Sequence, residues 1–111
     1  RTRLWANMGG FYDNGELAYR IAQDQWTHMV MTVDAEANNT LRIYVNGELE
    51  LTATGVPRVF TVAGESNEFA LGVNYWDTPF NGAIDELKVF GGVIAAERVN
   101  ELYQEGAEAV Q

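Results

Sequence analysis

Short runs of alternating apolar and polar residues cover most of the chain, and turn-forming residues separate these runs. The clearest example is residues 41–45, which are followed by Asn46-Gly47 and by a second alternating run at 48–54. A period of two is typical of a strand with one buried face, and Asn-Gly favours the positive φ angles of a two-residue hairpin turn. This segment predicts a β-hairpin with a core face and a water-facing face.

The apolar side chains of this hairpin are expected to share the core face, while Tyr44 and the charged residues take the face toward water. The predicted core positions are Leu41, Ile43, Val45, Leu49, Leu51 and Ala53. A second Asn-Gly pair, Asn14-Gly15, stands between the runs 4–12 and 16–22 and predicts another hairpin.

Three further strands are expected from apolar runs. Residues 26–33 are apolar on both faces, which predicts a central strand with Trp26 in the core and His28 in a structural hydrogen bond. Residues 69–73 alternate as a half-buried strand. Residues 83–90 alternate with a slip at Asp85-Glu86, where a β-bulge would absorb one residue.

The period changes near the end of the chain from that of a strand to that of a helix. Ala95, Val99, Leu102 and Tyr103 form one helical stripe, and Gly106 is expected to end the helix. Together these patterns predict an all-β, antiparallel β-sandwich with a short C-terminal helix, in which residues 1–111 form a single domain.

Several motifs occur in an order that is more specific than any one of them. They are Trp-Thr-His at 26–28 before an apolar strand, Tyr-Val-Asn-Gly at 44–47, Leu-Gly at 71–72, Phe-Asn-Gly-Ala-Ile-Asp-Glu-Leu-Lys-Val-Phe at 80–90, and the terminal helix. This order resembles the laminin-G-like domains, which are concanavalin-A-like lectin/glucanase domains found in bacterial and animal surface proteins. The resemblance implies a jelly-roll sandwich.

The chain departs from this family pattern at two places. Ala95 and Ala96 stand where family members usually carry a capping Ser or Thr before the last helix. The opening strands of the family have no counterpart before Arg1, so the resemblance implies a domain that is incomplete at its N-terminus. A sandwich without these strands would expose an open sheet edge, and self-association or complementation by the missing strands is then expected.

Composition narrows the range of partners. The formal net charge of −9 would repel nucleic-acid backbones and anionic lipids, whereas neutral glycans, cations and basic protein surfaces remain open. No apolar run is long enough for membrane insertion. The chain has no Cys, so neither disulfides nor thiolate metal sites can form.

Catalysis is not expected from this chain, although it could be an accessory module of an enzyme. A retaining glycosidase needs two carboxylates about 5 Å apart. Asp85 and Glu86 alternate to opposite faces of the predicted strand, and Ala83, Leu87 and Lys88 occupy the neighbouring same-face positions. The carboxylate pair that sandwich-fold glycoside hydrolases use therefore does not form there.

Calcium is the candidate cofactor. It binds carboxylate and carbonyl oxygens, and Asn74, Asp77, Asn81 and Asp85 lie close together in sequence. The family resemblance implies that Asp85 is either a calcium ligand or an acceptor for loop amides. Asn81 is the second candidate ligand, and its alternative role is to support the turn into Gly82.

Aromatic residues at predicted loop positions indicate a carbohydrate site, because sugar rings stack on aromatic rings while Asn and Asp bond to their hydroxyls. Tyr75 and Trp76, with Asn74 and Asp77, follow a predicted strand and precede Pro79. Trp5 and Tyr12 are supplementary candidates. The alternative is that these aromatic side chains cover the rim of the core.

The leading functional hypothesis is a noncatalytic carbohydrate-binding module of a secreted or cell-surface protein of bacterial origin. The alternative is an adhesion or structural domain that binds a surface protein through the open sheet edge. A third hypothesis is one part of a glycan-active enzyme whose catalytic carboxylates lie outside this chain.

Overall fold

A computed structural model of the chain describes residues 2–7, 11–17, 22–56 and 81–109. The chain divides into two compact units, one formed by Arg1–Val59 with Gly91–Gln111 and the other by Phe60–Phe90. The strand predicted at residues 69–73 lies outside the described residues.

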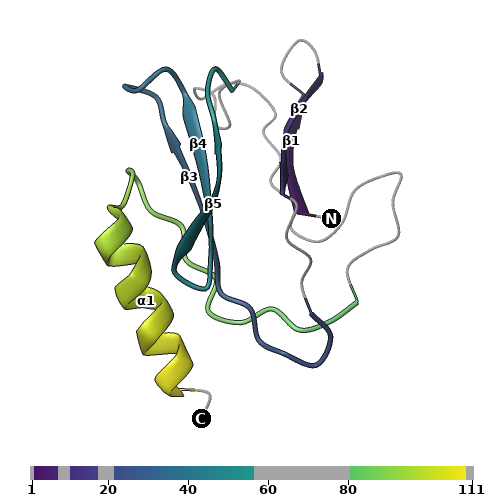
Figure 1. Ribbon diagram of the computed structural model, residues 1–111, viewed down its shortest axis with the longest axis vertical. Helices are drawn as coiled ribbons and strands as arrows, with labels where there is room; N and C mark the ends of the chain where they lie inside the picture. The colour runs from purple at the N-terminus through teal and green to yellow at the C-terminus, as the bar shows by residue number, and fades with distance from the viewer. Residues whose placement is uncertain (1, 8–10, 18–21, 57–80, 110–111) are drawn as a thin grey trace. The chain divides into compact units, whose positions relative to one another are not determined.

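Five strands and one helix are assigned within the described part of the first unit (Figure 1). In chain order they are β1 (Thr2–Asn7), β2 (Phe11–Leu17), β3 (Met29–Asp34), β4 (Thr40–Val45), β5 (Glu48–Ala53) and α1 (Ala96–Ala109). All strand pairs are antiparallel: β1 pairs with β2, and β3, β4 and β5 form a sheet in that order. Antiparallel pairing was predicted, whereas a complete sandwich is not seen in the described residues.

The hairpin of β4 and β5 confirms the prediction made from Asn46-Gly47. Asn46 has φ 49° and Gly47 has φ 83°, and Val45 pairs with Glu48 across the turn. Two consecutive positive φ angles define the type I′ turn, whose twist matches that of the flanking strands. The loop between β4 and β5 therefore consists of two residues, Asn46 and Gly47.

The core is centred on β4, the middle strand of the three. Leu41 and Ile43 are fully buried and form a cluster with Val45 and Val56. Burying each such side chain contributes about 1.5–3 kcal/mol. The backbone N–H of Val56 donates to the carbonyl of Asn39, which holds the chain after β5 beside the start of β4.

One predicted core position was wrong because the pairing of β4 with β5 shifts after Ile43. Ile43 pairs with Leu51, but Tyr44 then pairs with Leu49, which leaves Glu50 as an extra residue in β5. Cross-strand partners share a face of the sheet. Leu49 therefore joins Tyr44 and leaves the core face, and it is 50% exposed.

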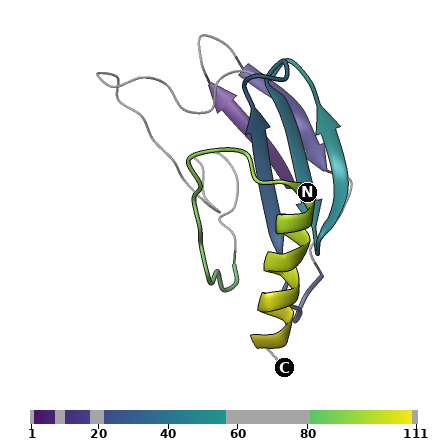
Figure 2. The same ribbon diagram turned by 90° about the vertical axis from the view of Figure 1, so that its left-hand side faces the viewer.

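Tyr44 was predicted to face water, yet it is buried. His28 lies on the same face as Tyr44 by alternation, since Met29 packs against the core cluster on the other face. The His28 ring lies 5.9 Å from the ring of Tyr103 in α1. The helix thus packs over the second face of the sheet, beside which it runs in both views (Figures 1 and 2).

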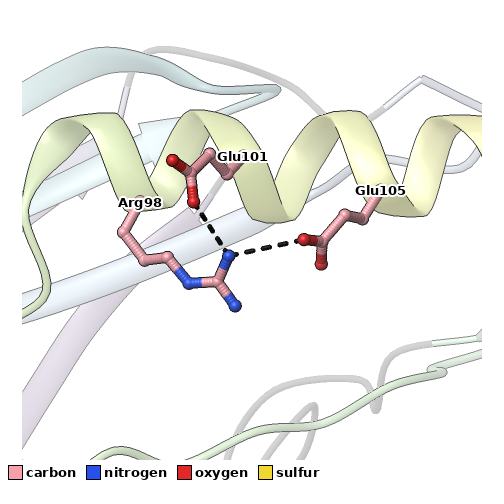
Figure 3. A network of polar contacts seen from close by, with 3 residues as sticks. All are labelled: Arg98, Glu101 and Glu105. Atoms are coloured by element: carbon pink, nitrogen blue, oxygen red, sulfur yellow. Dashed lines mark hydrogen bonds and ion pairs between the residues drawn. The ribbon is translucent and has the colours of Figure 1, made fainter.

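The helix forms where the sequence predicted one, but it ends later. Val99 and Leu102 of the predicted stripe are buried. Gly106 does not end the helix, because a glycine costs only about 1 kcal/mol inside a helix and the alanines after it favour continuation to Ala109. On the exposed face, Arg98 donates to Glu101 at 3.0 Å and to Glu105 at 3.4 Å (Figure 3).

Two strand predictions were also wrong. Asn14-Gly15 lies inside β2, where Gly15 pairs with Leu4, and residues 8–10 connect β1 to β2. The register shifts between Leu4 and Ala6, so that β2 accommodates the Asn-Gly pair as an irregularity within the strand. β1 thus ends at Asn7 and β2 begins at Phe11, both before the predicted turn.

Residues 83–90 do not form a strand in the structure, and each of them is exposed. A strand is stable only when its backbone groups pair with a neighbour. Within the described part of the chain, no strand pairs with this segment. In place of the predicted bulge, Glu86 has a left-handed backbone conformation with φ 54°.

Candidate functional site

The four loop residues proposed for sugar contact, Asn74, Tyr75, Trp76 and Asp77, lie outside the described residues. Their role in binding stays a prediction. Trp5 lies in β1 and Tyr12 lies in β2, and Tyr12 pairs with Ala6. The backbones of Trp5 and Tyr12 therefore belong to one antiparallel pair of strands.

Asp85 makes the loop-amide contact that was one of its two predicted roles. Its Oδ1 accepts a hydrogen bond from the backbone N–H of Glu86 at 2.8 Å. This bond accompanies the left-handed conformation of Glu86, because a short side-chain acceptor can satisfy an amide that the turned backbone leaves unpaired. The residue thus supports the left-handed conformation of Glu86, and calcium ligation by Asp85 stays a prediction.

Asn81 and Asp85 both lie in the exposed segment 81–90. Among the described residues, no group of three or more His, Asp or Glu side chains is placed to hold a metal ion. Asn74 and Asp77, the other oxygen donors considered for calcium, lie outside this part of the chain. A calcium site built by these four residues is therefore untested.

His28 lies just before β3 and makes structural contacts through its backbone, whereas the predicted hydrogen bond of its side chain stays a prediction. Its backbone N–H donates to Asn46 Oδ1 at 3.0 Å, and its carbonyl accepts from the Asn46 N–H at 2.8 Å. With its ring against Tyr103, His28 ties the start of β3 to the β4–β5 turn and to α1. Each of these contacts holds the fold together.

Trp26 is a candidate binding residue that was not predicted from the sequence. It was predicted in the core, but β3 begins only at Met29 and Trp26 is 57% exposed. The polar run Gln23-Asp24-Gln25 before it was the available signal, since such a run is typical of a loop. Asp24 has φ 58°, which turns the chain just before Trp26. In addition, β3 is an edge strand among the described strands, not a central one.

A run of exposed apolar side chains follows Asn81. Its large members are between 47% and 71% exposed, and they are Ile84, Leu87, Val89 and Phe90. In the first unit, Met31 of the edge strand β3 is also exposed. Large exposed apolar side chains that follow one another in sequence are typical of an interaction surface.

The comparison with protein families gives a match over nearly the whole chain. The family model Laminin_G_3, described as the concanavalin A-like lectin/glucanases superfamily, matches residues 1–100. The chain belongs to this superfamily. The motifs that carry the resemblance begin at Trp26, whereas the family match begins at residue 1. Strands β1 and β2 are thus part of the superfamily match.

A solved structure shows the same fold. It is a crystal structure of residues 221-444 of an S-layer domain-containing protein from Clostridium thermocellum, with a TM-score of 0.55 and 18% sequence identity. The alignment covers 88% of this chain and 48% of that structure, so the chain spans about half its length. None of the curated proteins compared with the chain shows a significant match.

No helix within the described residues is long and apolar enough to cross a membrane. Their notable surface features are Trp26 and the apolar residues between Ile84 and Phe90. Both are features of binding surfaces.

Proposed function

We propose that this chain is a noncatalytic carbohydrate-binding module of a secreted or cell-surface bacterial protein. The observation that carries the proposal is membership of the concanavalin A-like lectin/glucanases superfamily over residues 1–100. The likeness in fold to an S-layer domain-containing protein is compatible with a surface location. The net charge of −9 favours neutral sugars over acidic ones.

In this proposal, the sugar contacts the loop from Asn74 to Asp77. Tyr75 and Trp76 offer two aromatic faces in succession, and Asn74 and Asp77 supply an amide and a carboxylate for sugar hydroxyls. Stacking on aromatic rings gives affinity without a deep pocket, and polar neighbours fix the orientation of the ring. Trp5 and Tyr12 extend the contact.

The noncatalytic part of the proposal rests on the carboxylates. Asp85 already accepts a bond from the Glu86 amide, and Glu86 follows it directly in a left-handed conformation. In this proposal, these two adjacent carboxylates do not act as the pair that a retaining glycosidase places on the two sides of a glycosidic bond. Calcium, if bound, would act by ordering the loops, with Asp85 and Asn81 as ligands.

A fluorescence titration tests this proposal, because the chain has only three Trp residues. Neutral oligosaccharides are titrated into the wild type, Trp76→Ala and Trp26→Ala, with calcium and with a chelator. We expect a change in emission on binding that Trp76→Ala removes and Trp26→Ala retains. Sugar binding that survives Trp76→Ala unchanged would contradict the assignment of the loop. Asp85→Asn tests the calcium role in the same titration.

A second candidate function, adhesion or assembly through a protein partner, is favoured by the exposed apolar residues from Ile84 to Phe90. Leu87 and Val89 keep the alternation of a strand, and exposed strand-forming segments pair readily with other chains. Sedimentation velocity of the wild type, Val89→Lys and Gln104→Lys tests it. Gln104 is an exposed helix position and is the charge control. Association that only Val89→Lys abolishes would support assembly, and a monomeric wild type would argue against self-assembly.

A further inference from the structure

The chain contains three Asn-Gly dipeptides, which begin at Asn14, Asn46 and Asn81. In such a dipeptide, the backbone nitrogen of Gly can attack the side-chain carbonyl carbon of Asn, because Gly has no Cβ to hinder the approach. The structure places the first two in paired β-structure, where Gly15 pairs with Leu4 and Asn46-Gly47 forms the β4–β5 turn. Asn81-Gly82 lies outside every assigned strand and helix.

Two hydrogen bonds and the close packing of Gly47 against α1 restrain Asn46. Its Oδ1 accepts from the His28 N–H at 3.0 Å, and its own N–H donates to the His28 carbonyl at 2.8 Å. Gly47 lies so close to α1 that a Cβ on it would be 2.8 Å from Asn100 Oδ1. Ring closure at Asn46 would break these contacts, so the hairpin must open first.

Within the described part of the chain, Asn81 has none of these restraints. The residue is exposed, as is every residue from Asn81 to Gly92. Among the described residues, no hydrogen bond or ion pair engages the Asn81 side chain. The Asn81 side chain and the Gly82 amide can therefore rotate toward each other without breaking any contact of the described fold.

We propose that Asn81 is a site of spontaneous deamidation that the fold leaves open while it protects Asn46. The Gly82 nitrogen bonds to Asn81 Cγ, the Cγ–Nδ2 bond breaks, and the Gly82 amide proton leaves with Nδ2 as ammonia. Water then opens the resulting succinimide. Attack at Cγ gives aspartate, whereas attack at the main-chain carbonyl carbon gives isoaspartate.

The modification would change the exposed segment in two ways. It adds one negative charge four residues before Asp85, in a chain whose formal charge is already −9. The isoaspartate product also lengthens the main chain by one methylene just ahead of residues 83–90. That insertion would shift the register of any strand which this segment forms with a partner.

Peptide mapping by mass spectrometry tests the proposal on the intact chain. The protein is incubated at mildly alkaline pH in water labelled with heavy oxygen, in native buffer and in concentrated urea. It is then digested with an acid-active protease. In native buffer, Asn81 is expected to incorporate label at least about tenfold faster than Asn46, which corresponds to about 1.4 kcal/mol of hairpin opening. In urea the two rates should converge.

Gly82→Ala provides the matched control, because a Cβ at position 82 hinders attack only at Asn81. It should slow labelling at Asn81 and leave Asn46 unchanged, which serves as the internal reference in the same sample. Equal rates at Asn81 and Asn46 in native buffer would overturn the proposal. So would a difference that persists unchanged in urea, since the fold would then not be its cause.

Discussion

Gly47 is the residue at which a single methyl group tests both the hairpin turn and the docking of α1. Its φ of 83° lies in the left-handed region, and a Cβ there would be 2.8 Å from Asn100 Oδ1 and 3.1 Å from Tyr103 Cδ2. Gly55 has a similar φ of 69°, but nothing lies within 4 Å of its Cβ position. The two glycines therefore separate backbone strain from crowding.

The expected losses of stability follow from backbone strain and from crowding. An L-residue in the left-handed region costs about 1–2 kcal/mol, which is the whole expected loss for Gly55→Ala. Overpacking adds about 1–3 kcal/mol, and the lower end applies to Gly47→Ala because Asn100 is exposed and its side chain can rotate. Gly47→Ala should thus destabilise the fold by about 2–3 kcal/mol.

Urea unfolding followed by circular dichroism measures these differences as shifts in the free energy of unfolding. Asn100→Ala alone should change stability by less than about 0.5 kcal/mol, as exposed substitutions usually do. In the double variant with Gly47→Ala, Asn100→Ala should restore part of the stability lost to crowding and none of the stability lost to backbone strain. Equal losses for Gly47→Ala and Gly55→Ala would refute the close packing of α1 on the turn. No loss for either would refute the left-handed backbone.

Three further predictions use the same assay. Gly106→Ala should stabilise the chain by about 0.5–1 kcal/mol, because α1 continues through this position; a loss of stability would contradict the helix bounds. Ile43→Ala should cost about 2–5 kcal/mol, and Leu49→Ala should cost clearly less because it lies outside the core cluster; equal costs would contradict the register shift in β5. Arg98→Ala should change the urea midpoint little, and any loss should shrink in high salt, since its partners are exposed; a large, salt-independent loss would contradict that placement. The hydrogen bond that Arg98 donates to Glu101, aided by Glu105, raises the pKa of Arg98, so Arg98 itself is charged at neutral pH.

Local patterns predicted the elements whose partners are near in sequence. Asn46-Gly47 specified its turn because both residues tolerate positive φ, and the stripe of Val99 and Leu102 predicted the buried face of α1. These signals need no distant partner. The Asn14-Gly15 prediction failed because the same dipeptide can occupy an irregularity inside a strand, and the dipeptide alone does not distinguish the two.

The remaining errors concern contacts between distant segments. Leu49 left the core because one extra residue shifts the pairing of β5, and a shift by one residue reverses the faces. Trp26 and residues 83–90 are apolar enough to be buried. Their burial depends on which segments pack against them, and the local sequence does not specify those segments. In the candidate site, the sequence correctly anticipated that Asp85 can accept a loop amide.

A glycan array probed with the wild-type chain, with and without calcium, tests the central claim most directly. The proposed function predicts binding to a set of neutral glycans that share a terminal or internal sugar. An array without binding, obtained from a sample that unfolds cooperatively, would contradict a carbohydrate-binding function.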